Sequence, residues 1–321
     1  MGISRSSTSV IDRPHLGEAV SVFTMAGLVG HFVLPFHPKA NRAGKYSKFS
    51  AAHAAQRPDN RYAGRGQYNR LTLQTSNSDY DCVSRGLECE LSDHDRADYM
   101  SMFDAEVEVA SAPYRANWLR FESDVASAVE AAGATNTHAA GGGTPWSNNA
   151  SGVPIDDLHQ AKRTLLGLTG EEPRGLRISK QSQYDLSVSA QILAKLGSSN
   201  ASKATIPVSV LAEVLDFDVI LISHGYYNTA NLGQAASMSP IWDADKAQVF
   251  YPTMSDARGY ALGPIAKPQI GRTILWDAWG DPYNIEQYRE DDAEQEVYRN
   301  KLSYDNEVFD TAFLYQISGV D

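Results

Sequence analysis

Cysteine is scarce in this sequence, which has only Cys82 and Cys89 among its 321 residues. Two cysteines are too few for a disulfide-stapled extracellular scaffold, and they lack the further ligands that a structural zinc site needs. Cys82 and His94 form the only pairing of a nucleophile with a base that lies within reach in sequence, and an α/β hydrolase using this dyad is one alternative. A small buried side chain is the commoner role of such a cysteine.

Long uninterrupted apolar runs are also missing. AVSVFTMAGLVGHFVL at residues 19–34 could imitate the core of a signal peptide, but Gly27, Gly30 and His31 interrupt it. It is shorter than the ~20 apolar residues that cross a bilayer, and no clear cleavage site follows Pro35. We therefore expect no membrane association, and an N-terminal segment that packs on its own subunit or on a neighbour.

The sequence has no surplus of positive charge. Its 28 Lys and Arg against 39 Asp and Glu give a net charge of −11, whereas affinity for phosphate backbones comes from clustered basic residues. The glycine-rich pieces GGGTPW at 141–146 and GRGQY at 64–68 lack the Lys-Ser/Thr ending of a phosphate-binding loop. We expect any nucleic acid near this protein to be enclosed rather than gripped.

No group of residues with catalytic spacing stands out either. His224 follows an apolar strand, but without a carboxylate or metal ligand nearby in sequence it is interpreted as a structural turn residue. The acids from Glu290 to Glu296 lack the spacing of a calcium loop, which favours a solvated face. GYYNTANLGQAASMSPIW at 225–242 gathers amides and hydroxyls that do not titrate at neutral pH. The sequence therefore predicts no enzyme, metal site or cofactor.

What the sequence does have is charge that is strongly segregated along the chain. Residues 35–70 carry eight Lys or Arg against the single acid Asp59, whereas residues 79–130 carry thirteen acids against four arginines. Residues 281–321 add eleven acids against three bases. A basic segment broken by glycine and proline cannot easily neutralise itself, so we expect it to meet acidic surfaces of an identical neighbour in head-to-tail association.

Hydrophobic periodicity predicts a mixture of helices and strands. Alternation predicts strands at KYSKF (45–49) and YNRLTLQT (68–75), on both sides of a long loop. Apolar residues at three- and four-residue steps, from Trp118 to Ala132, predict a helix that Gly133 can end. Its polar face is expected to carry Arg120, Glu122, Asp124 and Glu130. The other expected elements are a flexible joint at 135–153, helices at 154–168 and 209–216, strands at 175–179 and 218–223, and C-terminal strands with Tyr298, Leu302 and Tyr304 on one face.

Taken in order, these features resemble the major capsid proteins of tailed bacteriophages, whose Hong Kong 97-like fold is shared with encapsulins. The resemblance covers nearly the whole chain from about residue 20, contains no catalytic motif and depends on five stretches in the same order. These are VLPFHPKANRAGKYSKF, RLTLQTSNSDYDCVSRGLECELSDHDRADY, PIDDLHQAKRTLLGLTGEEPRGLRIS, YNTANLGQAASMSPIW and EQYREDDAEQEVYRNKLSYDNEVFDTAFLYQISGV.

The resemblance implies an α+β capsid fold with defined parts. An N-terminal arm would occupy residues 1–34 and an extended β-hairpin loop 35–92. A peripheral domain would occupy 93–150 and would be built on a long spine helix near 107–132. An axial domain would occupy 151–283, and strands at 284–321 would return to complete both domains.

The resemblance also implies a structural function without a cofactor. Copies would form pentamers and hexamers of an icosahedral head that encloses double-stranded DNA without reading its sequence, in a virion assembled in the bacterial cytoplasm. Portal and scaffolding proteins, and a cement or decoration protein, would be the other partners. An encapsulin-type compartment is the alternative.

Inter-subunit contacts are expected on two segments. The basic loop would contribute Lys45, Lys48, Arg57, Arg61, Arg65 and Arg70, and the uncharged axial segment Asn228 and Asn231. Some family members join a loop lysine covalently to an asparagine of a neighbour. No residue pattern here identifies that asparagine or its catalytic acid, so we predict contacts that are not covalent.

Overall fold

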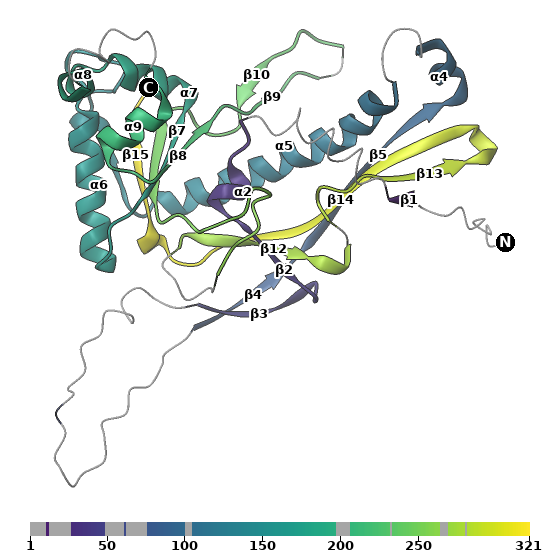
Figure 1. The fold of residues 1–321 in the computed structure, drawn as a ribbon, viewed down its shortest axis with the longest axis horizontal. Helices are drawn as coiled ribbons and strands as arrows, with labels where there is room; N and C mark the ends of the chain where they lie inside the picture. Colours follow the sequence, from purple (N-terminus) through teal and green to yellow (C-terminus); the bar gives the residue numbers. More distant parts are fainter. Residues whose placement is uncertain are drawn as a thin grey trace.

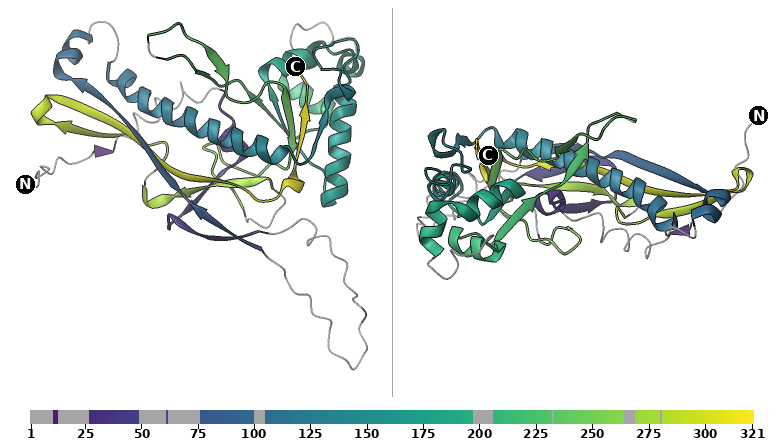
Figure 2. Two further views of the ribbon diagram at one scale, coloured as in Figure 1. Left: turned by 180° about the vertical axis from the view of Figure 1, so that it is seen from behind. Right: turned by 90° about the horizontal axis from the view of Figure 1, so that it is seen from above.

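One long helix organises the fold in the computed structural model of this chain. Helix α5 (Ala105–Gly133) has 29 residues and runs along one sheet towards a second sheet at the end of the molecule that carries the C-terminus (Figures 1 and 2). The structure describes residues 11–12, 27–48, 61, 76–99, 105–196, 206–231, 233–263, 269–279 and 281–321.

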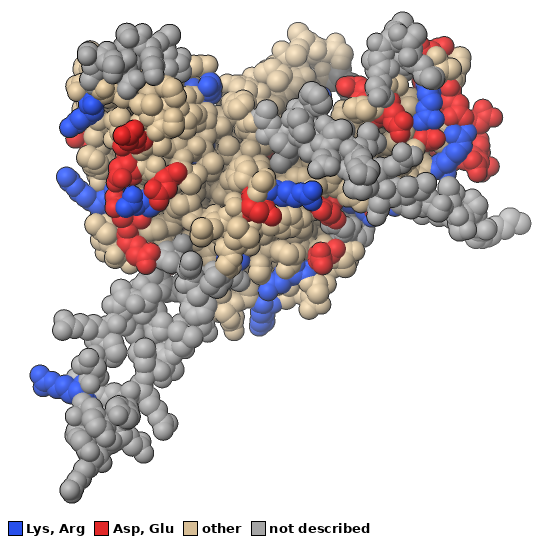
Figure 3. Space-filling model, in the orientation of Figure 1, with Lys and Arg blue, Asp and Glu red and all other residues tan. Residues whose placement is uncertain are grey.

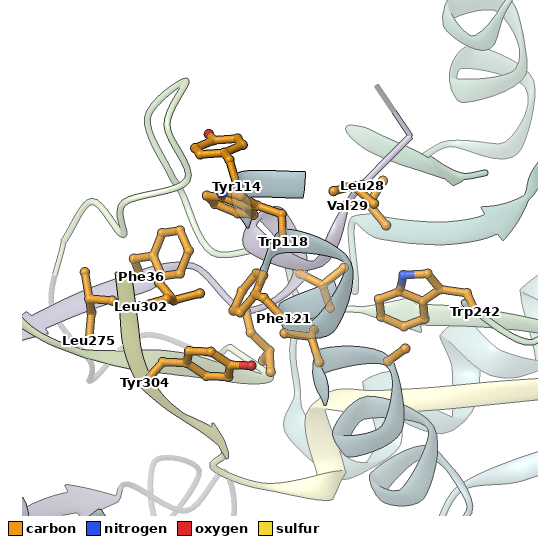
Figure 4. Packing of buried hydrophobic residues seen from close by; sticks show 14 of the residues in the cluster. Leu28, Val29, Phe36, Tyr114, Trp118, Phe121, Trp242, Leu275, Leu302 and Tyr304 are labelled. Atoms are coloured by element: carbon orange, nitrogen blue, oxygen red, sulfur yellow. The ribbon is translucent and has the colours of Figure 1, made fainter. Parts of the chain in front are cut away.

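Helix α5 confirms the long helix expected over 107–132. Trp118, Phe121, Val125 and Val129 recur at three- and four-residue steps and are completely buried. Figure 4 shows the rings of Trp118 and Phe121 beside Phe36, and edge-to-face contacts join these aromatic side chains. The apolar stripe of the sequence is therefore the face on which the first core forms.

The first sheet, called the long sheet here, has six strands in the order β1-β13-β14-β12-β2, with β5 on the other edge of β14. Its strands are β1 (Ile11–Asp12), β2 (Phe36–Lys39), β5 (Val83–Ser92), β12 (Gly271–Trp276), β13 (Glu286–Glu290) and β14 (Gln295–Val308). Helix α5 packs on one face, where Tyr298, Leu302 and Tyr304 are buried as the alternation of the sequence predicts.

The second sheet has five strands in the order β6-β15-β11-β7-β8. Its strands are β6 (Thr137–Ala139), β7 (Gly175–Ser179), β8 (Val219–Ser223), β11 (Lys246–Phe250) and β15 (Leu314–Ser318). Helices α6 (Pro154–Thr169), α7 (Lys180–Val188), α8 (Ala190–Leu196) and α9 (Val208–Leu215) accompany it and share a second core. The predicted helices at 154–168 and 209–216, and the strands at 175–179 and 218–223, are confirmed within one residue at each end.

Short elements complete the described chain. They are helices α2 (Gly30–Val33) and α4 (Asp93–Tyr99) and the 3-10 turns η1 (Ala140–Gly142), η2 (Asp277–Trp279), η3 (Asp291–Ala293) and η4 (Thr311–Phe313). Among the described helices, none combines the length and hydrophobicity needed to cross a membrane.

The prediction of a flexible joint over 135–153 is wrong. Strand β6 pairs in parallel with β15, and Trp146 is completely buried. The Trp146 indole donates a hydrogen bond of 2.8 Å to the Asp157 carboxylate, which also accepts from the backbone of Gly141. Glycine and asparagine favour turns locally, but here a buried aromatic side chain and a carboxylate from the first turn of α6 hold those turns in place.

Two hairpins project from the body (Figure 1). One pairs β3 (Ala43–Lys48) with β4 (Ser76–Asp81), and the other pairs β9 (Tyr226–Asn228) with β10 (Met238–Pro240). The strand predicted at 45–49 is thus present as β3. The strand predicted at 68–75 lies outside the described residues, and β3 pairs instead with residues 76–81.

Candidate functional site

The nucleophile and base suggested by the sequence do not form a catalytic pair. Cys82 is completely buried, its thiol faces the Ile274 carbonyl at 3.6 Å, and burial raises its pKa to about 11. His94 lies on α4, where it is exposed and faces Asp98. The extended strand β5 separates the two residues, at about 3.3 Å per residue or roughly 30 Å in total. The hydrolase alternative has no geometric support.

The other candidate functional motifs of the sequence, His224 and the acids of η3, show no arrangement suited to catalysis or metal binding among the described residues. The His224 ring packs against Gly27, where a side-chain carbon would approach the ring to 2.5 Å. The His224 backbone also donates to the Gly27 carbonyl at 3.2 Å. The acids of η3 are exposed, and among the described residues no group of three His, Cys, Asp or Glu is placed to hold a metal.

Acids from both acidic segments of the sequence gather on one surface. Strand β5 pairs with β14 over ten residues, from Ser92↔Gln295 to Val83↔Tyr304, so segments some 200 residues apart lie side by side. The exposed acids around the end of this sheet are Glu88, Glu90, Asp95, Asp98, Glu290, Asp291, Asp292 and Glu294. Figure 3 shows acidic side chains gathered at this end, with basic residues among them. We call it the acidic edge.

Arginines on α4 and β13 neutralise the inner acids of this region. Arg96 contacts Glu296 at 2.7 Å, and its hydrogen bond lowers the pKa of that carboxyl. Arg289 contacts Asp93 at 2.6 Å, which lowers the Asp93 pKa in the same way. The half-buried acids are therefore satisfied within the subunit, and the remaining negative charge belongs to the exposed acids of the acidic edge.

The β3–β4 hairpin is less cationic on its surface than the sequence suggests. Lys45 lies 3.8 Å from Asp79 on the opposite strand, with side chains 74% and 79% exposed. Arg42 lies 3.5 Å from Asp81, so the expectation that the basic segment cannot satisfy itself is wrong for these two residues. The basic segment finds these acids because β4, which begins after it, folds back along β3.

The remaining predicted contact residues of the loop fall in different places. Lys48 lies over the Tyr46 ring, 5.4 Å from its centroid, and Arg61 is exposed. Arg57, Arg65 and Arg70 lie outside the described residues.

The base of this hairpin is anchored on the long sheet. Tyr46 donates a hydrogen bond from its hydroxyl to Glu307, and the Asp81 backbone donates to Asp305 at 2.9 Å. A small core of Tyr46, Tyr80, Cys82 and Ile274 lies beneath the strands. The base of the hairpin is therefore part of the folded body. Cys82 is one of the buried apolar residues of this small core.

The β9–β10 hairpin contains the two predicted asparagine contacts, and both are exposed. The Asn228 side-chain oxygen accepts hydrogen bonds from the backbones of Ala230 and Ser237, at 3.0 and 2.9 Å. The Asn231 carbonyl accepts from Gln234 at 3.1 Å. The carbonyl side of Asn228 is therefore used to shape the turn of its own hairpin.

A buried carboxylate connects three distant parts of the chain. Glu122 on α5 is inaccessible to solvent and accepts hydrogen bonds from the backbones of Val29 and Gly30, at 2.9 and 2.8 Å. It also accepts from the Trp242 indole, in the segment that follows β10. Burial raises the pKa of Glu122, against the opposing effect of these three donors. We call this cluster the Glu122 junction.

Oppositely charged groups surround this junction. The Arg177 guanidinium is completely buried, lies 4.5 Å from the Trp242 ring and donates to the Ser223 hydroxyl at 3.0 Å and to the Lys246 carbonyl at 2.9 Å. About two turns further along α5, Glu130 accepts from Lys246 at 3.1 Å. The helix of the long sheet is thereby tied to the second sheet through hydrogen bonds as well as through packing.

Comparisons with solved structures distinguish the capsid fold from the α/β hydrolase alternative. No family model matches the chain, and no curated protein matches it. Among solved structures, a phage-related protein of Bordetella bronchiseptica RB50 matches at a TM-score of 0.69 and 17% identity, over 97% of this chain and 98% of that one. The capsid structure of the cyanophage P-SCSP1u matches at a TM-score of 0.56 and 11% identity, over 99% and 90%. The chain has the Hong Kong 97-like capsid fold.

The same fold is found in a virus-like particle. The virus-like particle from Pyrococcus furiosus matches at a TM-score of 0.50 and 11% identity, over 95% of this chain and 98% of that one. These solved structures are shell proteins or phage-related proteins, and none is described as an enzyme. The fold predicted from the sequence is confirmed.

Within this capsid fold, Glu122 is a buried structural residue whose position differs from the sequence-based prediction. It was expected on the polar face of the helix, yet it lies four residues after Trp118 and three before Val125, which is the spacing of the buried stripe. The spacing of Glu122 from Trp118 and Val125 was the sequence signal that indicated its burial. Its buried partners Val29 and Trp242 are about a hundred residues away on either side, so no local pattern pointed to them.

Proposed function

We propose that this chain is the major capsid protein of a tailed bacteriophage. In this proposal, identical copies form pentamers and hexamers that close into an icosahedral head around double-stranded DNA. The observation that carries it is the match of nearly the whole chain to a phage capsid structure, over 99% of this chain. At 11% identity that match establishes the fold, and the function is our inference from it.

The distribution of charge supports self-association. A hairpin with the exposed Lys45 and the half-buried Lys48 projects from the body, Arg61 is also exposed, and the acidic edge presents eight exposed acids. We propose that the basic loop, with Arg57, Arg65 and Arg70, lies over the acidic edge of an adjacent subunit. Each exposed pair contributes only ~0.2–1 kcal/mol, so many copies acting together fix the register of subunits.

The finer parts of the proposal follow the resemblance. They are the division into an N-terminal arm, an extended loop, a peripheral domain, an axial domain and return strands, at the residue boundaries given above. They also include portal and scaffolding partners, a cement or decoration protein, assembly in the bacterial cytoplasm and contacts that are not covalent. Net negative charge suits the wall of a container that must not adhere to packed DNA.

Electron microscopy of the protein, expressed alone and with its neighbouring gene products, tests the shell-forming role. We expect closed particles of uniform diameter. Only monomers under every condition, including with the neighbouring products, would contradict the proposal. On a denaturing gel of mature particles we expect single subunits, whereas a ladder of covalent oligomers would contradict the prediction that the contacts are not covalent.

A charge-matched pair of variants tests the role of the loop. Arg61→Gln with Arg65→Gln removes two charges from the basic loop, and Arg163→Gln with Lys195→Gln removes two from exposed positions on α6 and α8. We expect only the loop variant to raise the subunit concentration needed for assembly and to reduce its salt dependence. If both variants changed the subunit concentration needed for assembly, and its salt dependence, to the same extent, the loop would not form the assembly contact.

The contents of the particles distinguish a phage head from an encapsulin-type compartment. The match to the Pyrococcus furiosus particle over 95% of this chain keeps the compartment as a second candidate. Particles purified from the natural source should hold nuclease-protected double-stranded DNA of uniform length if the chain forms a phage head. Particles that hold an enzyme instead of DNA would favour the compartment.

A further inference from the structure

The β9–β10 hairpin presents an uncharged apolar surface. Residues 225–242 contain no Asp, Glu, Lys or Arg, in a chain in which 21% of residues are charged. Because Asn228 pairs with Met238 and Tyr226 with Pro240, these four side chains share one face of the hairpin. Tyr226 is 51% exposed and Met238 59% exposed. Figures 1 and 2 show the hairpin extending away from the body.

Composition places this face among protein interfaces rather than among ordinary surfaces. Tyrosine and methionine are enriched in the fully buried centres of interfaces, and charged residues are depleted there. Asn228, on the same face, directs its side-chain oxygen to the turn of its own hairpin. The apolar groups of Tyr226, Met238 and Pro240 therefore remain as the main groups that this face can offer to another molecule.

A separate apolar groove lies on the same chain. It has a volume of about 610 Å³, and its lining includes Phe32, Val219, Leu221, Pro252, Met254 and Leu262. Met254 is 70% exposed and Leu262 55% exposed. Two acids also line it, and both have partners within the subunit: Asp218 lies 3.8 Å from Arg174, and Asp256 accepts from the backbone of Tyr260 at 2.8 Å. An uncharged hairpin entering this groove would leave these contacts intact.

We propose that the apolar face of the β9–β10 hairpin docks into this groove on a second copy of the chain. The inference rests on the proposed shell-forming function. A protruding patch and a different recessed patch on one chain produce a heterologous contact, which closes into a ring when the rotation between copies closes. Because neither surface depends on an exposed ion pair, this contact supplies affinity that salt does not screen.

Variants on the two faces of the hairpin test the contact. Tyr226→Ser with Met238→Ser alters the apolar face, and Tyr227→Ser is the matched control on the opposite face, where Tyr227 is 42% exposed. We expect the double variant to fold like the wild type by circular dichroism and to need a roughly tenfold higher subunit concentration for assembly, with Tyr227→Ser unchanged. Assembly of the double variant at the wild-type concentration would overturn the proposal.

Disulfide trapping tests the groove as the partner. In a Cys89→Ser background, subunits carrying Met238→Cys are mixed with subunits carrying Met254→Cys, assembled and oxidised, while the buried Cys82 stays in place. Because each subunit has one new cysteine, a disulfide between the two kinds can form only between molecules. We expect mixed dimers on a non-reducing gel, and none after oxidation of the unassembled mixture. Assembled particles without mixed dimers would overturn the assignment of the groove.

The two experiments separate this contact from the shell-forming role. If the wild-type protein forms no particles under any condition, the proposed function fails. If it forms particles while both hairpin experiments give negative results, the shell role stands and the contact is wrong.

Discussion

Charged residues occupy opposite settings in the Glu122 junction and in the β3–β4 hairpin. Glu122 and Arg177 are both inaccessible to solvent, and each of the two carboxylate oxygens of Glu122 accepts a hydrogen bond from a distant segment. In the hairpin, Lys45 and Asp79 are 3.8 Å apart, and about three quarters of each side chain is exposed. The two regions therefore use charge under very different dielectric conditions.

We infer from this difference that the buried charges stabilise the fold of the subunit, whereas the exposed charges are available for contacts with a neighbouring subunit. A buried charge costs several kcal/mol to desolvate, so its partners must be in place for the subunit to fold. An exposed pair contributes about 0–1 kcal/mol and leaves the fold nearly unchanged when it is lost. We therefore expect junction variants to alter the stability of the subunit and hairpin variants to alter association between subunits.

The largest effect is expected for Glu122→Ala. The change leaves the Val29, Gly30 and Trp242 donors without this acceptor and removes one of the negative charges near the buried Arg177, so the free energy of unfolding should fall by about 3–5 kcal/mol. Urea denaturation of unassembled subunits measures it. The control is Glu108→Ala, at an exposed position of the same helix, with an expected change within ~0.5 kcal/mol. A similar loss in the free energy of unfolding for both variants would contradict a special role of the buried carboxylate.

The next largest effect is a pH dependence of the stability of the subunit, caused by His31, which adjoins the Glu122 junction. Burial lowers the pKa of His31 from 6.5 to about 4, so the unfolded chain binds the proton first as the pH falls. Stability should therefore be lost between pH 6.5 and pH 4, by up to about 3 kcal/mol. Denaturation of His31→Leu over this range should show a flatter profile than the wild type. Parallel profiles would exclude His31 as the cause.

An intermediate effect is expected at the acidic edge, where Arg96 and Glu296 are partly buried. The Arg96 hydrogen bond lowers the pKa of Glu296, so its stabilising effect is present above pH 4.5 and is lost as the pH falls through the lowered pKa. Arg96→Met should cost about 1 kcal/mol at neutral pH and raise the Glu296 pKa. Carboxyl chemical shifts of unassembled subunits measure that pKa. An unchanged titration would show that Arg96 does not control this carboxyl.

The smallest effect on the subunit is expected for an exchange of charge, Lys45→Asp with Asp79→Lys. The exchange preserves the net charge and the pair within the hairpin, so the free energy of unfolding should change by less than ~0.5 kcal/mol. It reverses the charge that each strand offers to a neighbour, so the salt dependence of assembly should weaken. Light scattering at several salt concentrations measures this, and an unchanged salt dependence would place these two residues outside the subunit contact.

The elements that sequence predicted well are those with a local cause. Helix α6 begins at Pro154, which suits a first turn, and ends before Gly170, which has the left-handed conformation with φ of 77°. Strand β7 reads GLRIS and lies wholly within a buried sheet. In such segments the periodicity, the start signal and the stop signal all agree, so the boundaries follow from neighbouring residues.

The candidate site was less predictable because its partners are distant in sequence. The composition of residues 281–321 gave their net charge, but only the pairing of β5 with β14 places them beside residues 83–92. Asn228 was predicted as a contact from its residue type, whereas the contribution of its oxygen to the turn depends on Ser237 across the hairpin. The hairpin and the groove likewise become visible only when β8, β9 and β10 are placed in space.

The position of β14 and β15 determines when each subunit can complete its fold during synthesis. Strand β14 pairs with β5, β12 and β13, and β15 lies between β6 and β11, so both sheets lack an inner strand until residues 295–318 are translated. Ribosomes add ~5–20 residues per second, so the strand β7 leaves the ribosome roughly 7–30 s before its sheet is complete. We therefore expect association between subunits, as proposed above, to follow the completion of the chain.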